Sequence, residues 1–272
     1  MRAFTLTSSL LATLTLMVGS ARASETPERA TQQILVDLQD DASGADELAL
    51  ERLIGGYDLR LNSVHADDER MFIADVPAHQ AAEIIARLRK DPRVEIAEPN
   101  AIYSLIEPTE LSFDTSKKDK VQKADDIDAQ LAPNDPLWSR QWSFRMVNAA
   151  KAWGTSQGEG VVVAVIDTGV AYENYKGFQR VEDLGGTAFV PGYDFVRDTE
   201  HPNDDHGHGT HVAGTIAQTT NNGLGVAGIA PKAKIMPLKV LSRRGSGTAA
   251  DIADAIRFAA DEGAQVINMS LG

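Results

Sequence analysis

Residues 204–217 read DDHGHGTHVAGTIA, and the rest of the chain is best interpreted outward from this stretch. Gly207 and Gly209 flank His208, so the backbone can turn tightly there and leaves the imidazole unshielded by neighbouring side chains. The small residues that follow suit a helix packed closely against other backbone, and Thr210 is a residue type favoured at a helix N-cap. The stretch therefore predicts an exposed imidazole at the mouth of a buried helix, a position suited to acid–base chemistry.

An acidic residue follows an apolar run upstream of this histidine. Residues 160–170 read GVVVAVIDTGV, a composition typical of a strand buried on both faces of a sheet. Asp167 then falls at the carboxyl end of a parallel strand, where open α/β sheets place their functional groups. A buried carboxylate there can accept the Nδ1 proton of His208, which fixes the tautomer and stabilises the imidazolium. Asp167 and His208 are the predicted catalytic pair.

Three motifs in the second half of the chain, AVIDTG, HGTHVAGT and VINMSLG, resemble those of the subtilisin-like serine peptidases (subtilases). They begin at residues 164, 208 and 266, and the resemblance extends over about residues 134–272. It implies an Asp–His–Ser triad in the chain order of subtilisin. Asp167 would then orient His208, which would act first as general base and then as general acid.

The nucleophile that the resemblance implies has no match in this sequence. In the family it lies in a Gly-Thr-Ser-Met-Ala segment well downstream, and the oxyanion-hole asparagine also lies beyond the strand at Val266. Gly154, Thr155 and Ser156 carry part of that pattern but precede the acid strand, so we interpret them as an ordinary loop. We therefore expect a chain truncated before its serine, with little or no peptidase activity by itself.

Strands and helices alternate over residues 133–272. The expected order is a helix at 149–153, the acid strand, the His208 helix, a strand at 235–241, a helix at 248–261 and a strand at 265–270. Alternation of this kind predicts a parallel sheet with right-handed crossovers, covered by helices on both faces. The fold class is therefore α/β, and by the resemblance a partial subtilisin-like doubly wound sheet.

Two backbone segments are predicted to bind substrate. Glycines cluster just past the strand at 235–241, and a glycine-rich extended segment lets another backbone add as a strand. The resemblance implies that this segment and the SLG of the third motif hold a peptide between them; a plain turn is the alternative for the first. The six residues are Gly245, Ser246, Gly247, Ser270, Leu271 and Gly272.

Residues 24–105 form a separate unit with the order β-α-β-β-α-β, which is a ferredoxin-like arrangement. Strands are expected at 34–38, 59–64, 71–76 and 94–97, and helices at 45–54 and 77–89. The apolar face of the first helix is expected to hold Leu48, Leu50, Leu53 and Ile54. The apolar stripe of the second helix is expected to hold Ala81, Ile84, Ile85 and Leu88. Before a subtilase, such an α+β domain resembles the family's inhibitory propeptide. It would assist folding and block the cleft as an intramolecular inhibitor, with a tail that follows Tyr103.

Residues 106–132 are charged and poor in large apolar side chains, so they are predicted to be an acidic linker that contains the maturation cut. Residues 1–23 have a basic start, a short apolar centre and an A-x-A ending, which is typical of a signal peptide cleaved after Ala23. A membrane anchor is the alternative. We expect a secreted or periplasmic protein with no membrane association after cleavage.

Charge and cysteine content exclude some classes. The net charge is −13, and residues 24–132 alone hold 24 acidic and 12 basic residues, which argues against a nucleic acid partner. The chain has no cysteine, so disulfides cannot stabilise it. Packing and bound metal are left for that role, and we expect a monomer that acts on protein or peptide substrates.

Calcium is the expected metal, because the loop NNGLGV at 221–226 resembles the family's calcium loop. The resemblance implies six ligands, which are Asp135, Asp183, Thr220, Asn222, Leu224 and Val226. Asp194, Asp198 and Asn203 form a possible second site, or only a solvated acidic loop. His206, His208 and His211 could instead be read as a zinc cluster, although we expect His211 to be a packed helix residue.

The sequence therefore predicts the precursor of a secreted serine endopeptidase. One alternative is an inactive fragment that acts only as a propeptide-type peptidase inhibitor. Another is a metal-binding protein that uses the histidine cluster.

Overall fold

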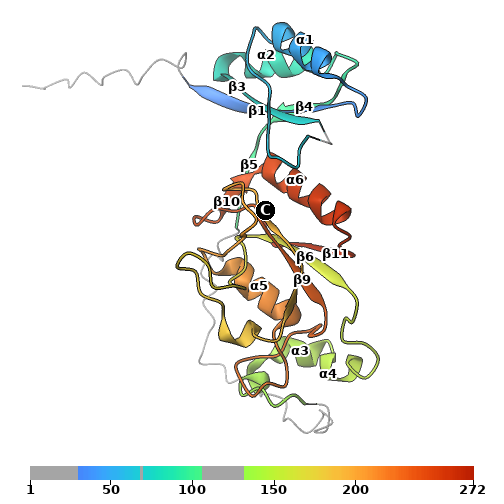
Figure 1. Ribbon diagram of the computed structural model, residues 1–272, viewed down its shortest axis with the longest axis vertical. Helices are drawn as coiled ribbons and strands as arrows, with labels where there is room; N and C mark the ends of the chain where they lie inside the picture. Colours follow the sequence, from blue (N-terminus) through green and yellow to red (C-terminus); the bar gives the residue numbers. More distant parts are fainter. Residues whose placement is uncertain (1–29, 68–69, 106–131) are drawn as a thin grey trace, which may run out of the picture.

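The computed structural model describes residues 30–67, 70–105 and 132–272. They form an N-terminal domain (residues 30–105) and a C-terminal domain (residues 132–272), which Figure 1 shows above and below one another. The predicted signal peptide and almost all of the predicted linker lie outside the described residues. Within the described residues, no helix is both long and apolar enough to cross a bilayer.

The N-terminal domain is a four-stranded antiparallel sheet with two helices on one face (Figure 1). Its elements are β1 (Thr31–Leu38), α1 (Gly44–Leu53), β2 (Arg60–Leu61), β3 (Met71–Pro77), α2 (Ala78–Leu88) and β4 (Val94–Pro99). The strand order is β2-β3-β1-β4. This is the predicted β-α-β-β-α-β order, although the strand expected at 59–64 is only two residues long.

The two helices of this domain differ in how well their sequence predicted their buried face. In α2 the predicted stripe is confirmed, because Ala81, Ile84, Ile85 and Leu88 are all buried. In α1 only part of the expected apolar face is buried. Leu50 and Ile54 lie in the core, whereas Leu48 is 53% exposed and Leu53 is 36% exposed.

The C-terminal domain is built on a parallel sheet. Its helices are α3 (Trp142–Met146), α4 (Ala149–Ala152), α5 (His208–Ala217) and α6 (Ala249–Asp261), with short 3₁₀ turns at Trp138–Arg140 and Glu182–Leu184. Its strands are β6 (Val162–Asp167), β7 (Ala188–Phe189), β8 (Tyr193–Asp194), β9 (Lys234–Lys239), β10 (Ser246–Thr248) and β11 (Val266–Met269). The main sheet has the order β11-β6-β9-β7, with β8 also paired to β9, and all of these pairings are parallel.

Strand β6 lies in the middle of this sheet and is covered on both faces, as predicted. Ala164 and Ile166 pack in the core beneath α6, whereas Val163 and Val165 pack in the core beneath α5. Since successive side chains of a strand point to opposite faces, a continuously apolar strand needs a helix on each side. Asp167 ends this strand, so its carboxylate lies where α5 approaches the edge of the sheet.

Candidate active site

Asp167 and His208 are in direct contact. The Nδ1 atom of His208 lies 2.8 Å from Oδ1 and 2.9 Å from Oδ2 of Asp167. Asp167 is completely buried, and its Oδ1 also accepts a hydrogen bond of 2.7 Å from the Thr168 amide. A buried carboxylate in this position selects the Nδ1–H tautomer of the imidazole and leaves Nε2 free to accept a proton.

His208 is the first residue of α5, so the helix starts two residues before the predicted N-cap, Thr210. Gly207 is the N-cap, with φ of +108°, which only glycine adopts easily. The Thr210 hydroxyl does not cap the helix; it accepts from the Ala171 amide at 3.0 Å and donates to Asp204 at 2.5 Å. The prediction for Thr210 was therefore wrong, because a glycine with positive φ ends the preceding loop earlier.

Close packing of α5 on β6 explains the glycine after the histidine. Gly209 is buried, and a Cβ atom there would overlap the carbonyl oxygen of Gly169 and lie 3.1 Å from the Asp167 side chain. Only glycine lets the first turn of the helix approach the strand end so closely. The backbone contact therefore sets the separation between the acid and the imidazole.

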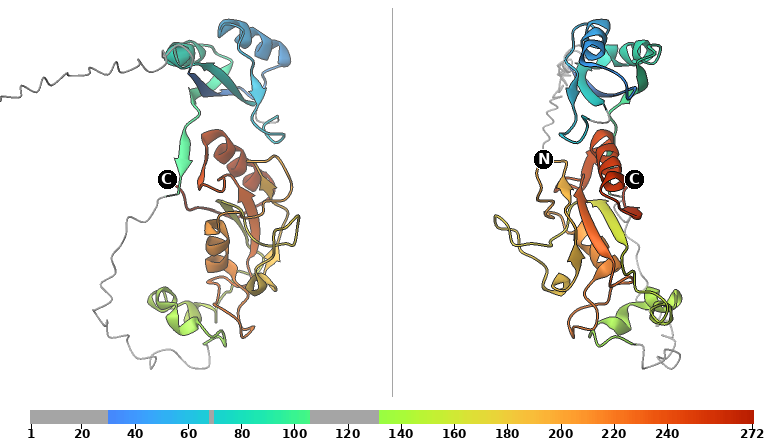
Figure 2. Two further views of the ribbon diagram at one scale, coloured as in Figure 1. Left: turned by 90° about the vertical axis from the view of Figure 1, so that its left-hand side faces the viewer. Right: turned by 45° about the vertical axis from the view of Figure 1, so that its right-hand side comes forward.

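The two predicted substrate segments flank an extended strand of the N-terminal domain. Strand β5 (Ile102–Ser104) pairs antiparallel with β10, with Tyr103 opposite Gly247. On its other edge, the Ser104 N–H and C=O bond the C=O and N–H of Gly272, both at 3.1 Å. Figure 2 shows β5 running down from the N-terminal domain to the end of the chain.

The segment that pairs with the predicted substrate segments begins before the position expected for a blocking tail, which was after Tyr103. Pairing with β10 already starts at Ile102, and the Leu105 amide still donates to the Gly245 carbonyl at 2.8 Å. The Leu105 side chain packs against the core beneath α6. Residues 102–105 thus lie between the two segments and bond to their backbone, as an added peptide strand would.

The predicted calcium ligands gather around one loop. Asp135 accepts from the amides of Asn221 and Asn222, and Asp183 accepts from the Asn222 side chain at 2.7 Å and from the Val226 amide at 3.1 Å. Both carboxylates are buried, and neither forms an ion pair with any basic side chain in the described part of the chain.

This donor set fits a hard cation. Buried anions without a positive partner are costly, and carboxylate, amide and carbonyl oxygens are the ligands that calcium prefers. Asp135, Asp183 and Asn222 already converge, while the Asn222 Oδ1 atom accepts from the Leu224 amide and would have to turn to bind metal. Thr220, Leu224 and Val226 lie in the same loop and could offer backbone carbonyls.

The possible second calcium site is not formed. Arg197 bridges Asp194 and Asp205, and the Lys239 Nζ also lies 2.9 Å from Asp205. Burial raises the pKa of Asp194, whereas burial of Asp205 is outweighed by its bonds to Lys239 and Arg197, which lower its pKa. Basic side chains already supply the positive charge that a cation would bring.

The other two residues of that possible site have different partners. Asp198 accepts from the Tyr193 hydroxyl at 2.6 Å, and Asn203 donates to Glu173 at 2.7 Å.

The zinc interpretation is also wrong for the described residues, where no three His, Asp or Glu side chains group as a metal site. His208 is engaged with Asp167, and the His206 ring accepts from the His208 amide at 3.3 Å. His211 is exposed rather than packed, because α5 turns that side chain away from the sheet.

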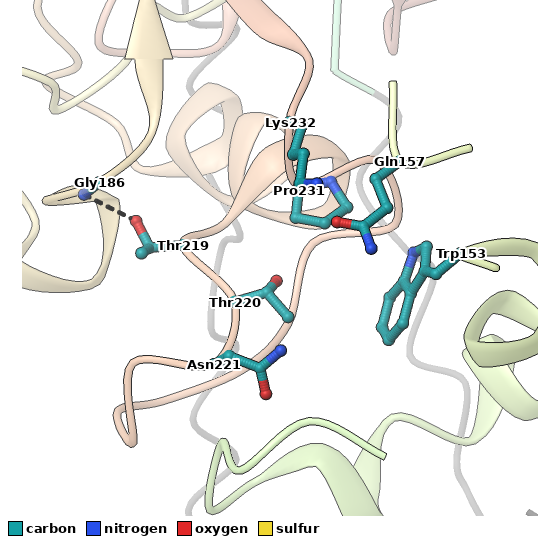
Figure 3. Close-up of a pocket in the computed structure, with 8 residues that line it drawn as sticks. All are labelled: Trp153, Gln157, Gly186, Thr219, Thr220, Asn221, Pro231 and Lys232. Carbon is teal, nitrogen blue, oxygen red and sulfur yellow. Dashed lines mark hydrogen bonds between the residues drawn. The ribbon is translucent and has the colours of Figure 1, made fainter. Parts of the chain in front are cut away.

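A cavity of about 270 Å³ lies away from the acid–histidine pair. It is lined by Trp153, Gln157, Gly186, Thr219, Thr220, Asn221, Pro231 and Lys232 (Figure 3). It borders the predicted calcium loop and contains none of the predicted catalytic or substrate-binding residues. Hydrogen-bond geometry, rather than concavity, therefore locates the candidate site.

Two groups of residues were missed by the sequence analysis. Lys239 is fully buried and donates to the carbonyls of Thr168 and Leu241 as well as to Asp205. A lysine within the apolar run IMPLKVL was a signal that it has buried acceptors. Asp254 of α6 accepts from Ser63 of the N-terminal domain, a long-range contact with no local signal.

The fold and the site together define a class: α/β proteins that carry an aspartate–histidine pair at the carboxyl end of a parallel sheet. Residues 158–272, which lie within the C-terminal domain, match the subtilase family.

Thermitase of Thermoactinomyces vulgaris is 45% identical over 52% of this chain and 48% of its own length. The halolysin-like extracellular serine protease Nep of Natrialba magadii is 30% identical over 94% of this chain and 43% of its own. The chain therefore spans less than half the length of these two relatives.

A solved structure has the same fold. It is fervidolysin from Fervidobacterium pennivorans, described as a keratinolytic enzyme related to subtilisin. The likeness has a TM-score of 0.62 and covers 89% of this chain and 36% of fervidolysin, with 23% identity.

Proposed function

We propose that this chain is part of the precursor of a secreted serine endopeptidase, and that Asp167 and His208 act with a serine supplied from outside these 272 residues. The observation that carries the proposal is the contact of His208 Nδ1 with both oxygens of a fully buried carboxylate. The thermitase likeness over half of the chain supports it. Several relatives are named extracellular proteases, which supports secretion.

In the proposed mechanism, Nε2 of His208 takes the proton of the attacking serine and later returns it to the leaving amine. Asp167 keeps the tautomer and stabilises the imidazolium as it forms. The peptide lies between the segments at 245–247 and 270–272, where residues 102–105 now lie. Backbone N–H groups and an asparagine from outside this sequence would stabilise the tetrahedral oxyanion.

The proposal is tested by comparing this chain with a product that continues through a downstream Gly-Thr-Ser-Met-Ala segment. We expect the longer product to cleave casein after its N-terminal domain is removed, and His208→Ala to abolish that cleavage. The 272-residue chain should not cleave casein. Cleavage that survives His208→Ala would overturn the proposal, and an inactive longer product whose N-terminal domain still inhibits other subtilases would favour the inhibitor-only function.

We further propose that residues 24–105 are the inhibitory propeptide and that β5 is its blocking tail. Ser104→Pro removes the N–H that bonds Gly272, and proline cannot donate within a ladder. We expect amide exchange at Leu105 and Gly272 to accelerate by about tenfold, since one backbone hydrogen bond and its neighbours are lost. Hydrogen exchange followed by NMR measures this, and Ser104→Ala, which keeps the amide, is the control. Equal exchange in both variants would contradict the proposed tail.

Calcium is proposed as a structural ion held by Asp135, Asp183, Asn222 and the carbonyls of Thr220, Leu224 and Val226. At tenfold excess over its dissociation constant, calcium should raise the free energy of unfolding by about 1.4 kcal/mol. Asp183→Asn should remove this increment, whereas Glu182→Gln, an exposed neighbour, should keep it. Thermal unfolding with and without calcium measures the difference, and a calcium response retained by Asp183→Asn would exclude this site.

A further inference from the structure

The carboxylate of Asp204, beside the acid–histidine pair, accepts five hydrogen bonds from described residues. Its Oδ1 accepts from the Thr168 hydroxyl and from the amides of His206 and Gly207, each at 2.9 Å. Its Oδ2 accepts from the Thr210 amide at 3.0 Å and from the Thr210 hydroxyl at 2.5 Å. These donors come from both sides of the site, the end of β6 and the first turn of α5.

The Thr168 hydroxyl is the link between the two sides. It donates to Asp204 and accepts from the Gly209 amide at 2.9 Å, and the Thr168 amide donates to Asp167. Thr168 is completely buried, so its hydroxyl cannot exchange these partners for water. A continuous path of hydrogen bonds thus runs from the carboxylate of Asp167 through Thr168 and Asp204 to the residues on either side of His208.

The two adjacent acids of this loop have different partners. Asp205 forms ion pairs with Lys239 and Arg197. Asp204 forms no ion pair among the described residues, and its charge is balanced by amide and hydroxyl dipoles at the positive end of α5.

We propose that Asp204 is a positioning residue of the active site, which acts through Thr168 to lock the first turn of α5 onto the end of β6 and so holds His208 Nδ1 against Asp167. The inference rests on the proposed function, because it assigns Asp204 to the same site. A helix cap alone would stabilise α5 without fixing its distance from β6. The shared Thr168 hydroxyl is what distinguishes positioning from capping.

The test is the Nδ1 proton of His208 in the full chain, observed by NMR. A proton held between an imidazole and a buried carboxylate resonates well downfield of the amides, and its exchange with water reports how firmly the pair is closed. In Thr168→Val, which keeps the shape but removes the hydroxyl, we expect exchange to accelerate at least about tenfold. Hydrogen bonds to a carboxylate are among the stronger ones in proteins, so their loss should open the pair more often. Thr168→Ser should restore the slow exchange.

Asp204→Asn gives a second, independent perturbation, since an amide must place its NH₂ against groups that also donate. We expect the same acceleration. The control is Asp198→Asn, an exposed acid of the same loop whose side chain, among the described residues, accepts only from Tyr193. Urea unfolding of each variant separates the two roles, because the loss of a cap alone would lower global stability without changing the Nδ1 exchange relative to the amides of α5.

The outcomes are distinguishable. A parent chain without the downfield proton contradicts the proposed function itself. A parent with this proton and a Thr168→Val variant that exchanges it no faster than the α5 amides would overturn the positioning role of Asp204. Should Asp204→Asn fail to fold, the Thr168→Val and Thr168→Ser pair still decides the question.

Discussion

Replacing Gly209 with alanine is expected to lower the free energy of unfolding by about 3 kcal/mol and to separate His208 from Asp167. The added methyl group would overlap the Gly169 carbonyl, which is backbone and cannot rotate away. Either α5 moves off the sheet or the strand end moves, and both changes break the contact of Nδ1 with the carboxylate.

Urea unfolding and the downfield Nδ1 proton of His208 measure the two consequences of Gly209→Ala separately. The control is Gly44→Ala in α1, where a Cβ meets nothing within 4 Å and alanine should be neutral or slightly stabilising because it favours helix. A Gly209→Ala variant as stable as Gly44→Ala, with the Nδ1 proton retained, would show that the close approach of helix and strand is not needed.

The sequence predicted the elements whose signals are local. The apolar run ending at Asp167, the stripe on α2 and the alternation of strands and helices each follow from periodicity, and the structure has them. The contact of Asp167 with His208 could be predicted because both residues lie at ends of elements that a parallel sheet brings to one edge.

The features that the sequence did not predict depend on contacts between distant segments. The N-cap of α5 is Gly207 rather than Thr210, and this follows from the positive φ of Gly207. The second calcium site was predicted wrongly because Arg197 pairs with both Asp194 and Asp205. A search of the sequence for metal ligands does not reveal that a guanidinium lies between these two acids. Neither feature has a residue pattern of its own, because each is set by tertiary packing.

The docking of the N-terminal domain on α6 is the clearest example. Arg257 of α6 pairs with Asp37 of β1 at 2.8 Å, and the His65 ring lies edge-on to Tyr193 and Phe258. These contacts join residues more than a hundred positions apart. The same interface contains an acidic side chain, Asp254 of α6, which accepts hydrogen bonds from Asn62 and Ser63.

Asp254 gives the second large prediction, a pH-dependent stability. The residue is 1% exposed, its Oδ2 accepts from Asn62 and Ser63 of the N-terminal domain, and its Oδ1 has no partner among the described residues. Burial raises the pKa of Asp254 from 3.8 to about 6, against the hydrogen bonds from Ser63 and Asn62, which lower it. The facing charges are Asp251, which raises the pKa of Asp254 further, and Arg257, which lowers it.

The sign follows from the direction of the shift. Because the pKa is higher in the docked, folded state, that state keeps the proton of Asp254 at a pH where the unfolded chain has lost it. The stabilisation is complete below about pH 4 and is lost as the pH rises to about 6. Two pKa units correspond to about 3 kcal/mol. We therefore expect neutral pH to weaken the docking of the N-terminal domain on α6.

Urea unfolding of the parent and of Asp254→Asn at pH 4.5, 5.5 and 6.5 measures this effect. The amide imitates the protonated acid, and the two proteins share every other titrating group, so the difference in free energy of unfolding isolates Asp254. We expect the parent to lose stability relative to Asp254→Asn as the pH rises, and Leu105 amide exchange to accelerate in parallel. Glu262→Gln, an exposed acid just after α6, should follow the parent. A difference that is constant or grows in favour of the parent with pH would mean that Asp254 is ionised in the interface.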